Sequence, residues 1–473
     1  MRTFHANFFG QACYFGMTRC YGAGQLHRQG PQPSSYNAVI SFKENPMVPH
    51  LITALTGPIN ELEQRILDSM PAIERWFRLE WMEHTPPFYC AVDIRNAGFK
   101  LAPVDTNLFP GGWNNLTPQM LPLAVQSAMA AIEKICPEAK NLLLIPENDT
   151  RSTFYLSNVA QLQRIFHMAG LNVRVGSINP DIKETTVVNL PNGEQVTLEP
   201  VIRSKRRLGL KDFDPCTILL NNDLSAGAPG ILEELHEQYL LPPLHAGWSV
   251  RRKSTHFRNY EELAKRLGKL LGIDPWLINP MFNQCGAVDM AQGQGMECLN
   301  TNVDALLGKI RRKYKEYGIN EKPFVIVKSD SGSRNMGIMT VRDVKDLAVL
   351  HHRAKTQQDD IPAQDIIIQE GVLTNERIND AVAEPVVYMM DRYVVGGFYR
   401  IHAERGVDEN LSAPGSSYVP LAFAESAHLP QVGMRPGASA PNRFYMYGVV
   451  GRLAMAAASY ELEATDPDAE TYD

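Results

Sequence analysis

Chemistry that handles a phosphate is best placed near position 328, where a lysine ends an apolar run and a loop of small residues follows. The run Phe324–Val327 contains two valines and an isoleucine, which favours a buried strand. Lys328 at its end would set an ammonium group against phosphate oxygens. Small side chains in the loop let backbone N–H groups approach the same anion. We therefore expect a phosphate site, with an ordinary strand and a solvated turn as the alternative. Its residues would be Lys328, Ser331, Gly332, Ser333 and Gly337.

A second group of cations precedes a predicted helix. Arg251, Arg252 and Lys253 come directly before an apolar face that recurs at helical spacing, and Ser254 or Thr255 is the expected N-cap. Cations at the start of a helix oppose its macrodipole, so their placement needs a partner. A polyphosphate would be such a partner. Solvated cations on a loop are the alternative.

Polar side chains of complementary types gather between residues 93 and 116, among apolar residues and glycine or proline turns. A zwitterionic amino acid needs a cation for its carboxylate, an anion or carbonyl for its ammonium group, and amides to fix its orientation. We expect this stretch to bind a substrate; in the alternative, the Asp and Asn residues cap turns and the cations are solvated. The residues that supply these types are Arg95, Lys100, Asp105, Asn107, Asn114 and Asn115.

A buried strand in the C-terminal half also ends in polar residues. Residues 366–372 begin with three isoleucines and continue through Gln369 and Glu370 to Val372. The backbone of such a segment can pair with the edge of an adenine ring, which leaves Glu370 for the ribose or the base. We therefore expect Gln369, Glu370 and Val372 to frame a nucleotide.

A predicted hairpin follows, in which a strand led by Glu384 turns at Asp391–Arg392. The returning strand places Arg400 and His402 on one face, because side chains two residues apart in a strand point to the same side. A loop that contains Asp408 and Asn410 comes next.

The elements that must position these residues alternate between strands and helices, which indicates an α/β layer. The Asn192-Gly193 pair marks a hairpin. Residues 275–300 are rich in Met, Gln and Gly and predict an irregular insertion. The next helix carries its basic run, Lys309–Lys315, opposite an apolar face, which is typical of a solvated surface. Other predicted elements are helices at 123–135, 158–169, 344–351 and 449–462, and strands at 88–92, 141–145, 172–175, 186–190 and 195–198.

Length and composition limit the classes of protein. A chain of 473 residues predicts two or three domains, and a net charge of −6 gives no general attraction to nucleic acid or anionic membranes. No apolar run approaches the roughly 20 residues that span a bilayer. The seven cysteines are scattered and include no C-x-x-C pair, which favours a reducing, cytoplasmic compartment over a disulfide framework or a zinc site. Residues 1–46 predict a disordered extension, with Met47 as an alternative start.

The order of these features resembles the ATP-grasp ligases. Glutathione synthetases in that group have an Arg-Ile pair and then an Asn-Leu-Ala-Ala-Gly-Gly loop, and Arg400-Ile401 and Asn410–Gly415 stand here in the same order. From about Met47 to the C-terminus, the chain resembles a bacterial family of glutamate–cysteine ligases built on that fold. The most specific strings are Asp93–Asn107 and Gly247–His256. The resemblance implies an α/β fold with an N-terminal substrate domain at 47–245 and an ATP-grasp domain of two subdomains at 246–473.

The resemblance also implies chemistry. ATP would phosphorylate the γ-carboxylate of glutamate, and the amine of cysteine would displace phosphate to give γ-glutamylcysteine, the first step of glutathione biosynthesis. Lys253 and Lys328 would hold the phosphates, and Arg400 would stabilise the transferring phosphoryl group or the oxyanion. The cofactors would be ATP and Mg²⁺, with Glu384, Asp408 and Asn410 as metal ligands in an order left open. The partners would be small molecules, without nucleic acid or membrane. The alternatives are another ATP-grasp carboxylate–amine ligase and a non-catalytic nucleotide- or RNA-binding protein.

Overall fold

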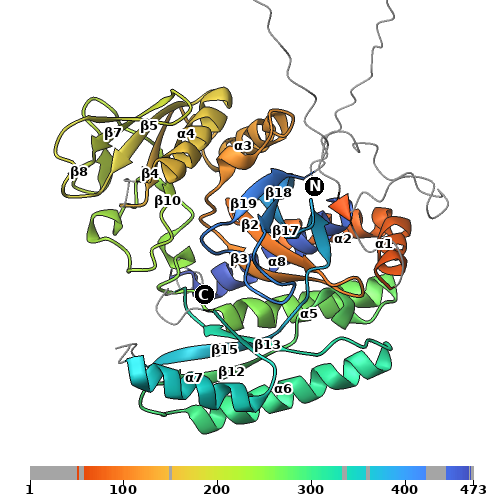
Figure 1. Cartoon of the computed structure of the whole chain (residues 1–473). Helices are drawn as coiled ribbons and strands as arrows, with labels where there is room; N and C mark the ends of the chain where they lie inside the picture. The colour runs from red at the N-terminus through yellow and green to blue at the C-terminus, as the bar shows by residue number, and fades with distance from the viewer. Residues whose placement is uncertain are drawn as a thin grey trace, which may run out of the picture. The chain divides into compact units, whose positions relative to one another are not determined.

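The computed structural model describes residues 51–52, 58–148, 152–332, 338–357, 363–421, 444–467 and 469. The predicted extension over residues 1–46 and the alternative start at Met47 lie outside them. All described elements belong to one unit, residues 49–473. This part of the chain is a mixed α/β structure with three larger sheets and a short two-stranded one (Figure 1).

The seven-stranded sheet joins strands from opposite ends of the sequence, and all its pairs are antiparallel. The hairpin of β2 and β3 pairs through β2 with β17, which also pairs with β18 over nine positions. Strands from both sides of the expected domain boundary near residue 246 therefore share one sheet. Its members are β1 (Leu51–Ile52), β2 (Tyr89–Asn96), β3 (Leu101–Asn107), β16 (Glu376–Ile378), β17 (Ala381–Met390), β18 (Tyr393–His402) and β19 (Ser417–Pro420).

Two long helices pack beside this sheet. Helix α8 (Phe444–Thr465) contacts β2, β3 and β17, and it also packs along α5 (Lys253–Leu271). Helix α5 has the apolar face that the sequence predicts. Helix α8 is instead buried on most sides, including the alanine-rich stretch Ala454–Ala458, because it packs between the sheet and α5. Helices α1 (Pro58–Asp68) and α2 (Met70–Glu83) begin the described helical part of the chain.

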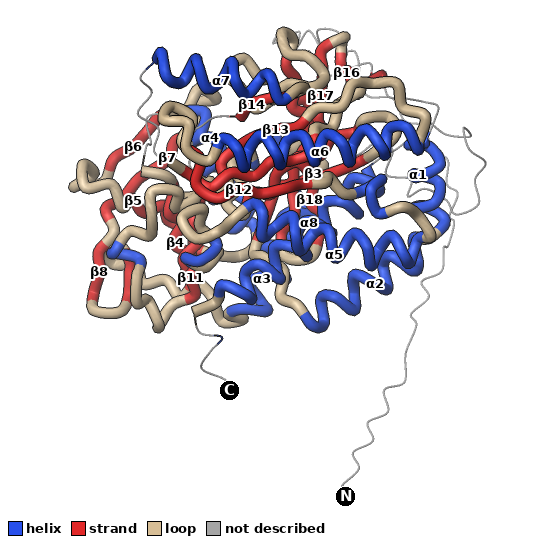
Figure 2. The backbone as a smooth tube through the Cα atoms, turned by 90° about the horizontal axis from the view of Figure 1, so that it is seen from below, coloured by secondary structure: helices blue, strands red, loops and turns tan. Residues whose placement is uncertain are grey.

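A four-stranded antiparallel sheet has its own hydrophobic core. Helix α6 (Met296–Glu316) lies along this sheet, and its predicted apolar face, including Val303 and Ile310, is buried there (Figure 2). Helix α7 (Val344–Gln357) packs on β14 and α6. The strand order is β12 (Phe282–Val288), β15 (Gln364–Glu370), β13 (Val325–Ser329) and β14 (Ile338–Val341).

The expectation of an irregular insertion over residues 275–300 is wrong. The stretch contains a short 3₁₀ helix, η4 (Pro275–Ile278), and strand β12, which pairs with β15. Only Cys285 and Val288 of β12 are buried. The local pattern was therefore too polar to indicate a strand, and pairing with the apolar neighbour β15 decides its conformation.

The six-stranded sheet confirms the predicted alternation of strands and helices. Its strands run parallel except for β6, and β6 and β7 form the hairpin expected at Asn192-Gly193, where Gly193 has a φ of +83°. Helix α3 (Leu121–Ile135) packs on α4 (Thr153–Met168) and on strands β17 and β18 of the neighbouring sheet. The strand order is β11 (Tyr239–Leu241), β10 (Thr217–Asn221), β4 (Asn141–Pro146), β5 (Asn172–Ser177), β7 (Gln195–Pro200) and β6 (Thr186–Asn189).

A buried charged cluster joins α8 to the segment that starts α5. Arg251 Nη2 and Nε each lie 3.0 Å from a carboxylate oxygen of Glu461, and His256 Nδ1 lies 3.4 Å from Glu461 Oε2. The side chains of Arg251 and Glu461 are each 1% exposed. Burial by itself would raise the pKa of Glu461, but the charge of Arg251 and the proximity of His256 lower it to about 2. None of the described helices is both long and apolar enough to cross a membrane.

Replacing Glu461 should therefore destabilise the protein strongly. Glu461→Ala leaves Arg251 buried without a carboxylate, which typically costs about 3–5 kcal/mol of unfolding free energy. Glu463→Ala is the matched control, because its carboxylate is 43% exposed and contacts His84 and the backbone N–H of Thr85 at the surface, so it should cost less than about 1 kcal/mol. Urea unfolding of the two variants would measure the difference, and equal losses would contradict the role of the cluster.

The same cluster predicts acid sensitivity. The pKa of Glu461 is lowered from its ordinary value of 4.5 to about 2, so its contribution to stability is complete above pH 4.5 and is lost as the pH falls toward 2. Between pH 5 and pH 3, roughly, the unfolding free energy of the wild type should fall more steeply than that of Glu461→Gln, which has no carboxyl group to protonate. Parallel pH dependences would contradict this assignment.

Candidate active site

Lys253 and Lys328, which lie 75 residues apart in the sequence, line the same cavity of about 300 Å³. Lys253 is the first residue of α5, and Lys328 lies near the end of β13. Lys253 Nζ donates a hydrogen bond of 3.0 Å to the carbonyl of Ser331, and Lys328 Nζ donates one of 2.9 Å to the carbonyl of Val104. The cavity, called the lysine cavity below, lies between the four-stranded sheet and β2 and β3 of the seven-stranded sheet.

Asp330 brings the two lysine-bearing segments together. Its carboxylate accepts hydrogen bonds from the backbone N–H of Ser254 at 2.6 Å and from the Ser254 hydroxyl at 2.7 Å. Its carbonyl accepts the backbone N–H of Lys253 at 2.8 Å. The prediction that Ser254 or Thr255 is the N-cap is wrong: Arg252 occupies that position without a side-chain capping bond. The physical reason is that Asp330, directly after β13, satisfies the first two amides of α5 with its carbonyl and its carboxylate, and the carboxylate also complements the helix dipole.

The lysine cavity has an unusual electrostatic balance. Burial, together with the charges of Lys328 and Arg251, lowers the pKa of Lys253 to about 8, although Asp105 opposes the shift. Burial also lowers the pKa of Lys328. Burial would raise the pKa of Asp105, but the surrounding cations outweigh it and lower the pKa. The cavity therefore holds two closely spaced lysines beside Asp105, while its other carboxylates are bonded to arginines or to Lys100. This is a suitable environment for a polyanion.

Several residues predicted for nucleotide binding line the lysine cavity. Ser331, Gly332, Gln369, Glu370 and Val372 all do so, and the apolar side chains of Ile326, Ile338 and Val104 complete its wall. Gln369 Nε2 is buried without a hydrogen-bond partner among the described residues, so this amide can still donate to a ligand. Gly332 packs directly on Trp248, where a Cβ would lie 2.1 Å from the ring. Ser333 and Gly337 lie outside the described residues.

Lys100 and Glu370 form a buried ion pair. Lys100 Nζ lies 2.7 Å from Glu370 Oε2, and each side chain is 1% exposed. Glu370 also accepts hydrogen bonds from the Trp276 indole and from the backbone N–H of Met281. Burial lowers the pKa of Lys100 to about 8, although the charge of Glu370 opposes the shift. The structure thus places Lys100 against Glu370 rather than beside the other residues predicted to bind a substrate.

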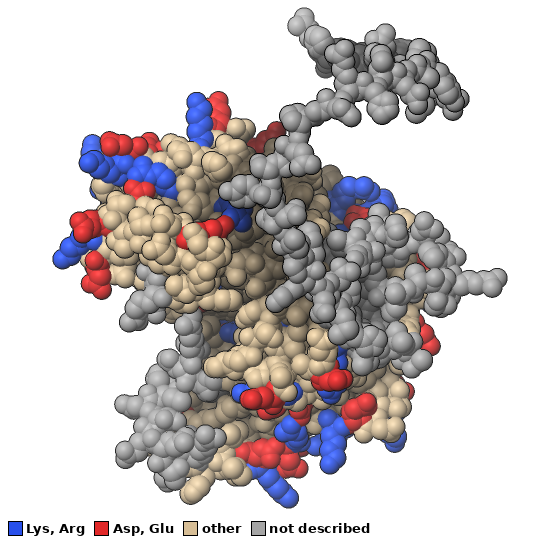
Figure 3. Space-filling view, turned by 45° about the horizontal axis from the view of Figure 1, so that its top comes forward, with Lys and Arg blue, Asp and Glu red and all other residues tan. Residues whose placement is uncertain are grey.

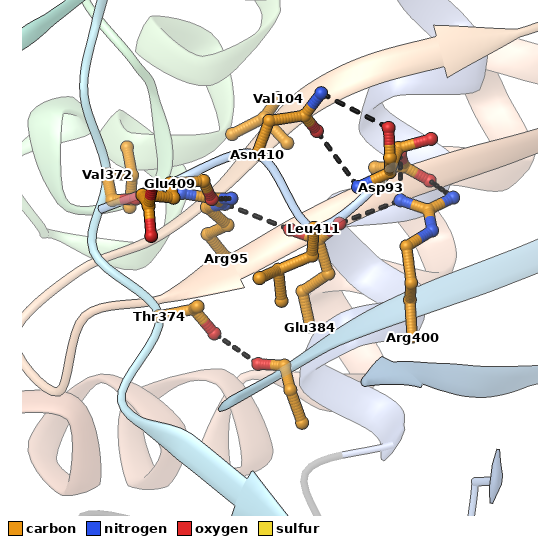
Figure 4. A network of polar contacts seen from close by, with 12 residues as sticks. Asp93, Arg95, Val104, Val372, Thr374, Glu384, Arg400, Glu409, Asn410 and Leu411 are labelled. Carbon is orange, nitrogen blue, oxygen red and sulfur yellow. Dashed lines mark hydrogen bonds and ion pairs between the residues drawn. The ribbon is translucent and has the colours of Figure 1, made fainter. Parts of the chain in front are cut away.

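Four charged side chains from three adjacent strands form a chain beneath the lysine cavity (Figure 4). Arg95 Nε lies 3.0 Å from one oxygen of Glu384, and Arg400 Nη1 lies 2.7 Å from the other. Arg400 Nη1 also lies 2.7 Å from Asp93 Oδ2. The Nε of Arg400 is buried without a partner among the described residues. Arg400 is therefore held from one side while it keeps a free donor.

Two of the three predicted metal ligands line the lysine cavity, and the third does not. Glu384 and Asn410 line the lysine cavity, whereas Asp408 is absent from its lining and forms an ion pair with Arg342. Both oxygens of Glu384 are bonded to arginines. The described residues contain no group of three or more His, Cys, Asp or Glu side chains arranged to hold a metal ion.

A second cavity, of about 320 Å³, adjoins the first, and we call it the asparagine cavity. Asp93, Asp105 and Ser412 line both cavities. Asn107 and Asn115 line the asparagine cavity as predicted substrate residues, together with Arg400. Asn115 Nδ2 is buried without a partner among the described residues. Asn114 is absent from the lining of both cavities, and Arg95 lines only the lysine cavity.

Sequence reasoning missed several residues of the asparagine cavity. Asp93 is one of them. It stands two residues before Arg95 in a buried strand, and this repeated charge on one face could have indicated a site. Tyr155 and Asn158 come from α4, and Asn158 is a polar residue on an otherwise apolar helix face. Tyr388, on β17, carried no indication of a site, because it belongs to an apolar strand.

The visible surface shows no large area of one charge. In Figure 3, Lys and Arg side chains are interspersed with Asp and Glu side chains over the described residues. In the basic run of α6, Lys313 lies 2.6 Å from Asp274 and 3.0 Å from Glu316.

The sequence profile of one protein family matches most of the chain. The family is described as glutamate-cysteine ligase (GshA), and its profile matches residues 63–462. The chain belongs to the glutamate–cysteine ligase family. It is therefore an enzyme, a ligase that joins glutamate to cysteine and forms γ-glutamylcysteine. This confirms the resemblance in the sequence and excludes the alternative of a non-catalytic binding protein.

A solved structure supports the family assignment. A candidate gamma-glutamylcysteine synthetase from Methylobacillus flagellatus KT is 55% identical, and the match covers 89% of this ligase and 100% of that chain with a TM-score of 0.82. D-alanyl-alanine synthetase A from Vibrio cholerae O1 biovar eltor str. N16961 is 14% identical, covers 59% of this chain and 73% of its own, and has a TM-score of 0.28. A glutathione synthetase-like effector from Globodera pallida is 11% identical, covers 76% and 84%, and has a TM-score of 0.34. The TM-scores of these last two structures are too low to support a conclusion about the fold. No curated protein matches the chain.

The Lys100–Glu370 pair yields a test that separates a structural role from substrate binding. Lys100→Met should lower the unfolding free energy by about 3–5 kcal/mol, because Glu370 then stays buried without its cation. The double variant Lys100→Met/Glu370→Gln should recover most of this loss, because no buried charge is left. Urea unfolding of the single and double variants provides the measurement. A Lys100→Met protein of normal stability that shows only a raised KM for an amino acid would instead support the predicted substrate role.

Proposed function

We propose that the ligase activates the γ-carboxylate of glutamate as an acyl phosphate, with ATP in the lysine cavity and glutamate in the asparagine cavity. The observation that carries this proposal is that two cavities of complementary character meet at Asp93, Asp105 and Ser412. One holds cations and apolar walls, and the other holds amides and an arginine. A phosphoryl group can pass between two substrates only where their sites meet.

The lysine cavity suits a nucleoside triphosphate. Lys253 and Lys328 would neutralise the phosphates, and the segment at Ser331 and Gly332 would supply backbone N–H groups. The apolar side chains of Ile326, Ile338 and Val372 would contact the two faces of adenine, and the unpartnered amide of Gln369 would bond its edge. The carboxylate of Glu370 is already bonded to Lys100 and Trp276. We therefore assign Glu370 the role of holding the cavity wall in place rather than that of binding the ribose or the base.

The asparagine cavity suits an amino acid. Asn115 Nδ2 and Arg400 Nε are buried donors that have no partner in the described part of the chain, and together they would provide hydrogen bonds for a carboxylate. Asn107 would orient the substrate, and Asp93 or Asp105 would receive its ammonium group. The γ-carboxylate would then reach the junction of the two cavities.

The chemistry follows from the weakness of a carboxylate as an electrophile. An oxygen of the γ-carboxylate attacks the terminal phosphorus of ATP and releases ADP. The amine of cysteine then attacks the carbonyl carbon of the acyl phosphate, loses a proton and expels phosphate. Arg400 lies at the junction with its free donor and would stabilise the charge that builds up on oxygen in both steps. Closely spaced cations also let two anionic substrates approach each other.

The residues at the junction fit a divalent cation. Mg²⁺ prefers oxygen ligands and is commonly held by one or two carboxylates together with substrate phosphates. Asp105 is ionised and lies between the cavities, and Asn410 lines the lysine cavity. Among the predicted ligands, Glu384 would first have to give up an arginine contact, and Asp408 would have to leave Arg342. Bound there, the ion would neutralise charge on the phosphates and polarise the transferring group.

We also propose that the fold is of the ATP-grasp type. The lysine cavity between the four-stranded sheet and the strands of the seven-stranded sheet supports this assignment. The boundary predicted near residue 246 would then divide the two domains along the sequence only. In space, β2 and β3 from the N-terminal part belong to the same sheet as β17 and β18 from the C-terminal part.

Lys328→Met tests the proposal. The substitution keeps the length of the side chain and removes the charge, so the protein should fold while kcat falls on the order of 10²-fold or more. ADP release that depends on both glutamate and cysteine provides the measurement. Lys309→Met on the exposed face of α6 is the matched control and should leave kcat unchanged. Near wild-type ADP release by Lys328→Met would refute the phosphate role.

The pKa of Lys253 predicts how nucleotide binding depends on pH. Because this pKa is about 8 in the protein without ligand, the ammonium group is lost as the pH rises above 8, and the Kd for ADP should then increase. Lys253→Arg should bind ADP with a flatter dependence, because a guanidinium stays charged across this range. Calorimetric titrations between about pH 7 and pH 9 would compare the two proteins. The same slope in both would contradict a contact between Lys253 and the phosphates.

A further inference from the structure

Two cysteines that are 13 residues apart in the sequence lie in contact at the edge of the four-stranded sheet. Cys285 is on β12 and is 5% exposed, and Cys298 is in the first turn of α6 and is exposed. Their sulfur atoms are 2.8 Å apart. We propose that Cys285 and Cys298 are a site of reversible oxidation, at which low-molecular-weight disulfides convert the two thiols into an intramolecular disulfide.

The fold prearranges the two sulfurs. A disulfide has a sulfur–sulfur distance of roughly 2.05 Å, so the atoms need to approach by less than about 1 Å. The connection between β12 and α6 is a tight loop in which Asp289 and Gln294 form a β-bridge. The carbonyl of Asp289 also accepts the backbone N–H of Gly293 at 2.9 Å. The backbone on both sides of the pair is therefore already ordered before the bond forms.

The surroundings give the two sulfur atoms different roles. Asn302 Nδ2 lies 3.4 Å from each of the two sulfur atoms, and it also donates to the carbonyl of Cys298. An amide donor shared by both sulfurs stabilises whichever one carries negative charge. Burial and the neighbouring Cys298 raise the pKa of Cys285 to about 12, although the Asn302 hydrogen bond opposes the shift. The exposed Cys298 is therefore the thiol that attacks the small disulfide first.

The exchange proceeds in two balanced steps. The thiolate of Cys298 attacks one sulfur of a small disulfide, which forms a mixed disulfide and releases one small thiolate. Cys285 then loses its proton and attacks the sulfur of Cys298, which forms the intramolecular bond and releases the second thiolate. The protein pair gives up two electrons, and the small disulfide is reduced to two thiols. The substrate cysteine and the product are both thiols, so their own oxidised forms belong to this class of reagent.

A second pair of cysteines provides an internal comparison. Cys136, at the end of α3, and Cys216, before β10, have sulfur atoms 3.2 Å apart, and both are only partly exposed. This pair lacks a fully exposed thiol for the first attack. Cys285 pairs with Ile366 on β15, the strand that also carries Gln369 and Glu370 of the lysine cavity.

The experiment uses the reduced, full-length protein and hydroxyethyl disulfide, a neutral probe that no amino-acid site selects. Free thiols are then alkylated, and the intact mass is measured before and after cleavage at Glu297, which lies between the two cysteines. The wild type should lose two hydrogens and retain no adduct, and its fragments should stay joined across Glu297 until a thiol reductant is added. Cys285→Ser should retain the adduct on Cys298, and Cys298→Ser should form neither product.

Other patterns of labelling would overturn the proposal. These are an adduct that persists on Cys298 in the wild type, fragments that separate at Glu297 without reduction, and a disulfide located at Cys136–Cys216 or at Cys13, Cys20 or Cys90 instead. Cys136→Ser is the matched control and should give the wild-type result. Because mass is the readout, failure here is distinguishable from failure of the proposed phosphate chemistry, which is measured by ADP release.

Discussion

The hydrogen bonds of Asp330 are the contact on which the rest of the site depends. Its carboxylate and carbonyl hold the first two residues of α5 against the end of β13. Without this contact, the first N–H groups of α5 would be unsatisfied, and the three cations before the helix would face its positive end without an anion. With it, Lys253 and Lys328 line one cavity, and Asp105 from a different sheet lies among them. A single acidic residue thus links two segments of the sequence into one cationic site.

The charged residues of the site differ in whether they form ion pairs with other side chains. Arg95, Glu384, Arg400 and Asp93 bind one another across adjacent strands, so their geometry is set before any substrate arrives. The two lysines instead donate only to backbone carbonyls, and burial lowers their pKa values although the charge of Asp105 opposes the shift. A site built in this way keeps its attraction for a polyanion while its arginines stay in place. Preorganised charge of this kind needs little rearrangement during the reaction.

The site is supported from behind by contacts that span almost the entire chain. Glu461 on α8 bonds to Arg251, which in turn donates to the carbonyl of Thr106, next to Asp105. The C-terminal helix therefore fixes both the start of α5 and the end of β3. In a buried environment such a network stabilises only when every charge has a partner, and each of these charges has one. The same condition explains why Lys100 and Glu370 lie together.

The sequence by itself determined the family, the long strands and helices, and most of the residues that line the lysine cavity, but only a few of those that line the asparagine cavity. These features follow from local order: β-branched runs make strands, apolar residues at helical spacing make helices, and the string Asp93–Asn107 is specific enough to indicate the family, as the profile match confirms. Tertiary structure alone decided the partners of the charged residues. It directed Lys100 to Glu370, placed Asp408 beside Arg342, made Asp330 the cap of α5, and turned the polar stretch Phe282–Val288 into a strand. The reason is that a buried charge or an unpaired strand edge must be satisfied by whatever group the fold brings near it, and that group can lie hundreds of residues away.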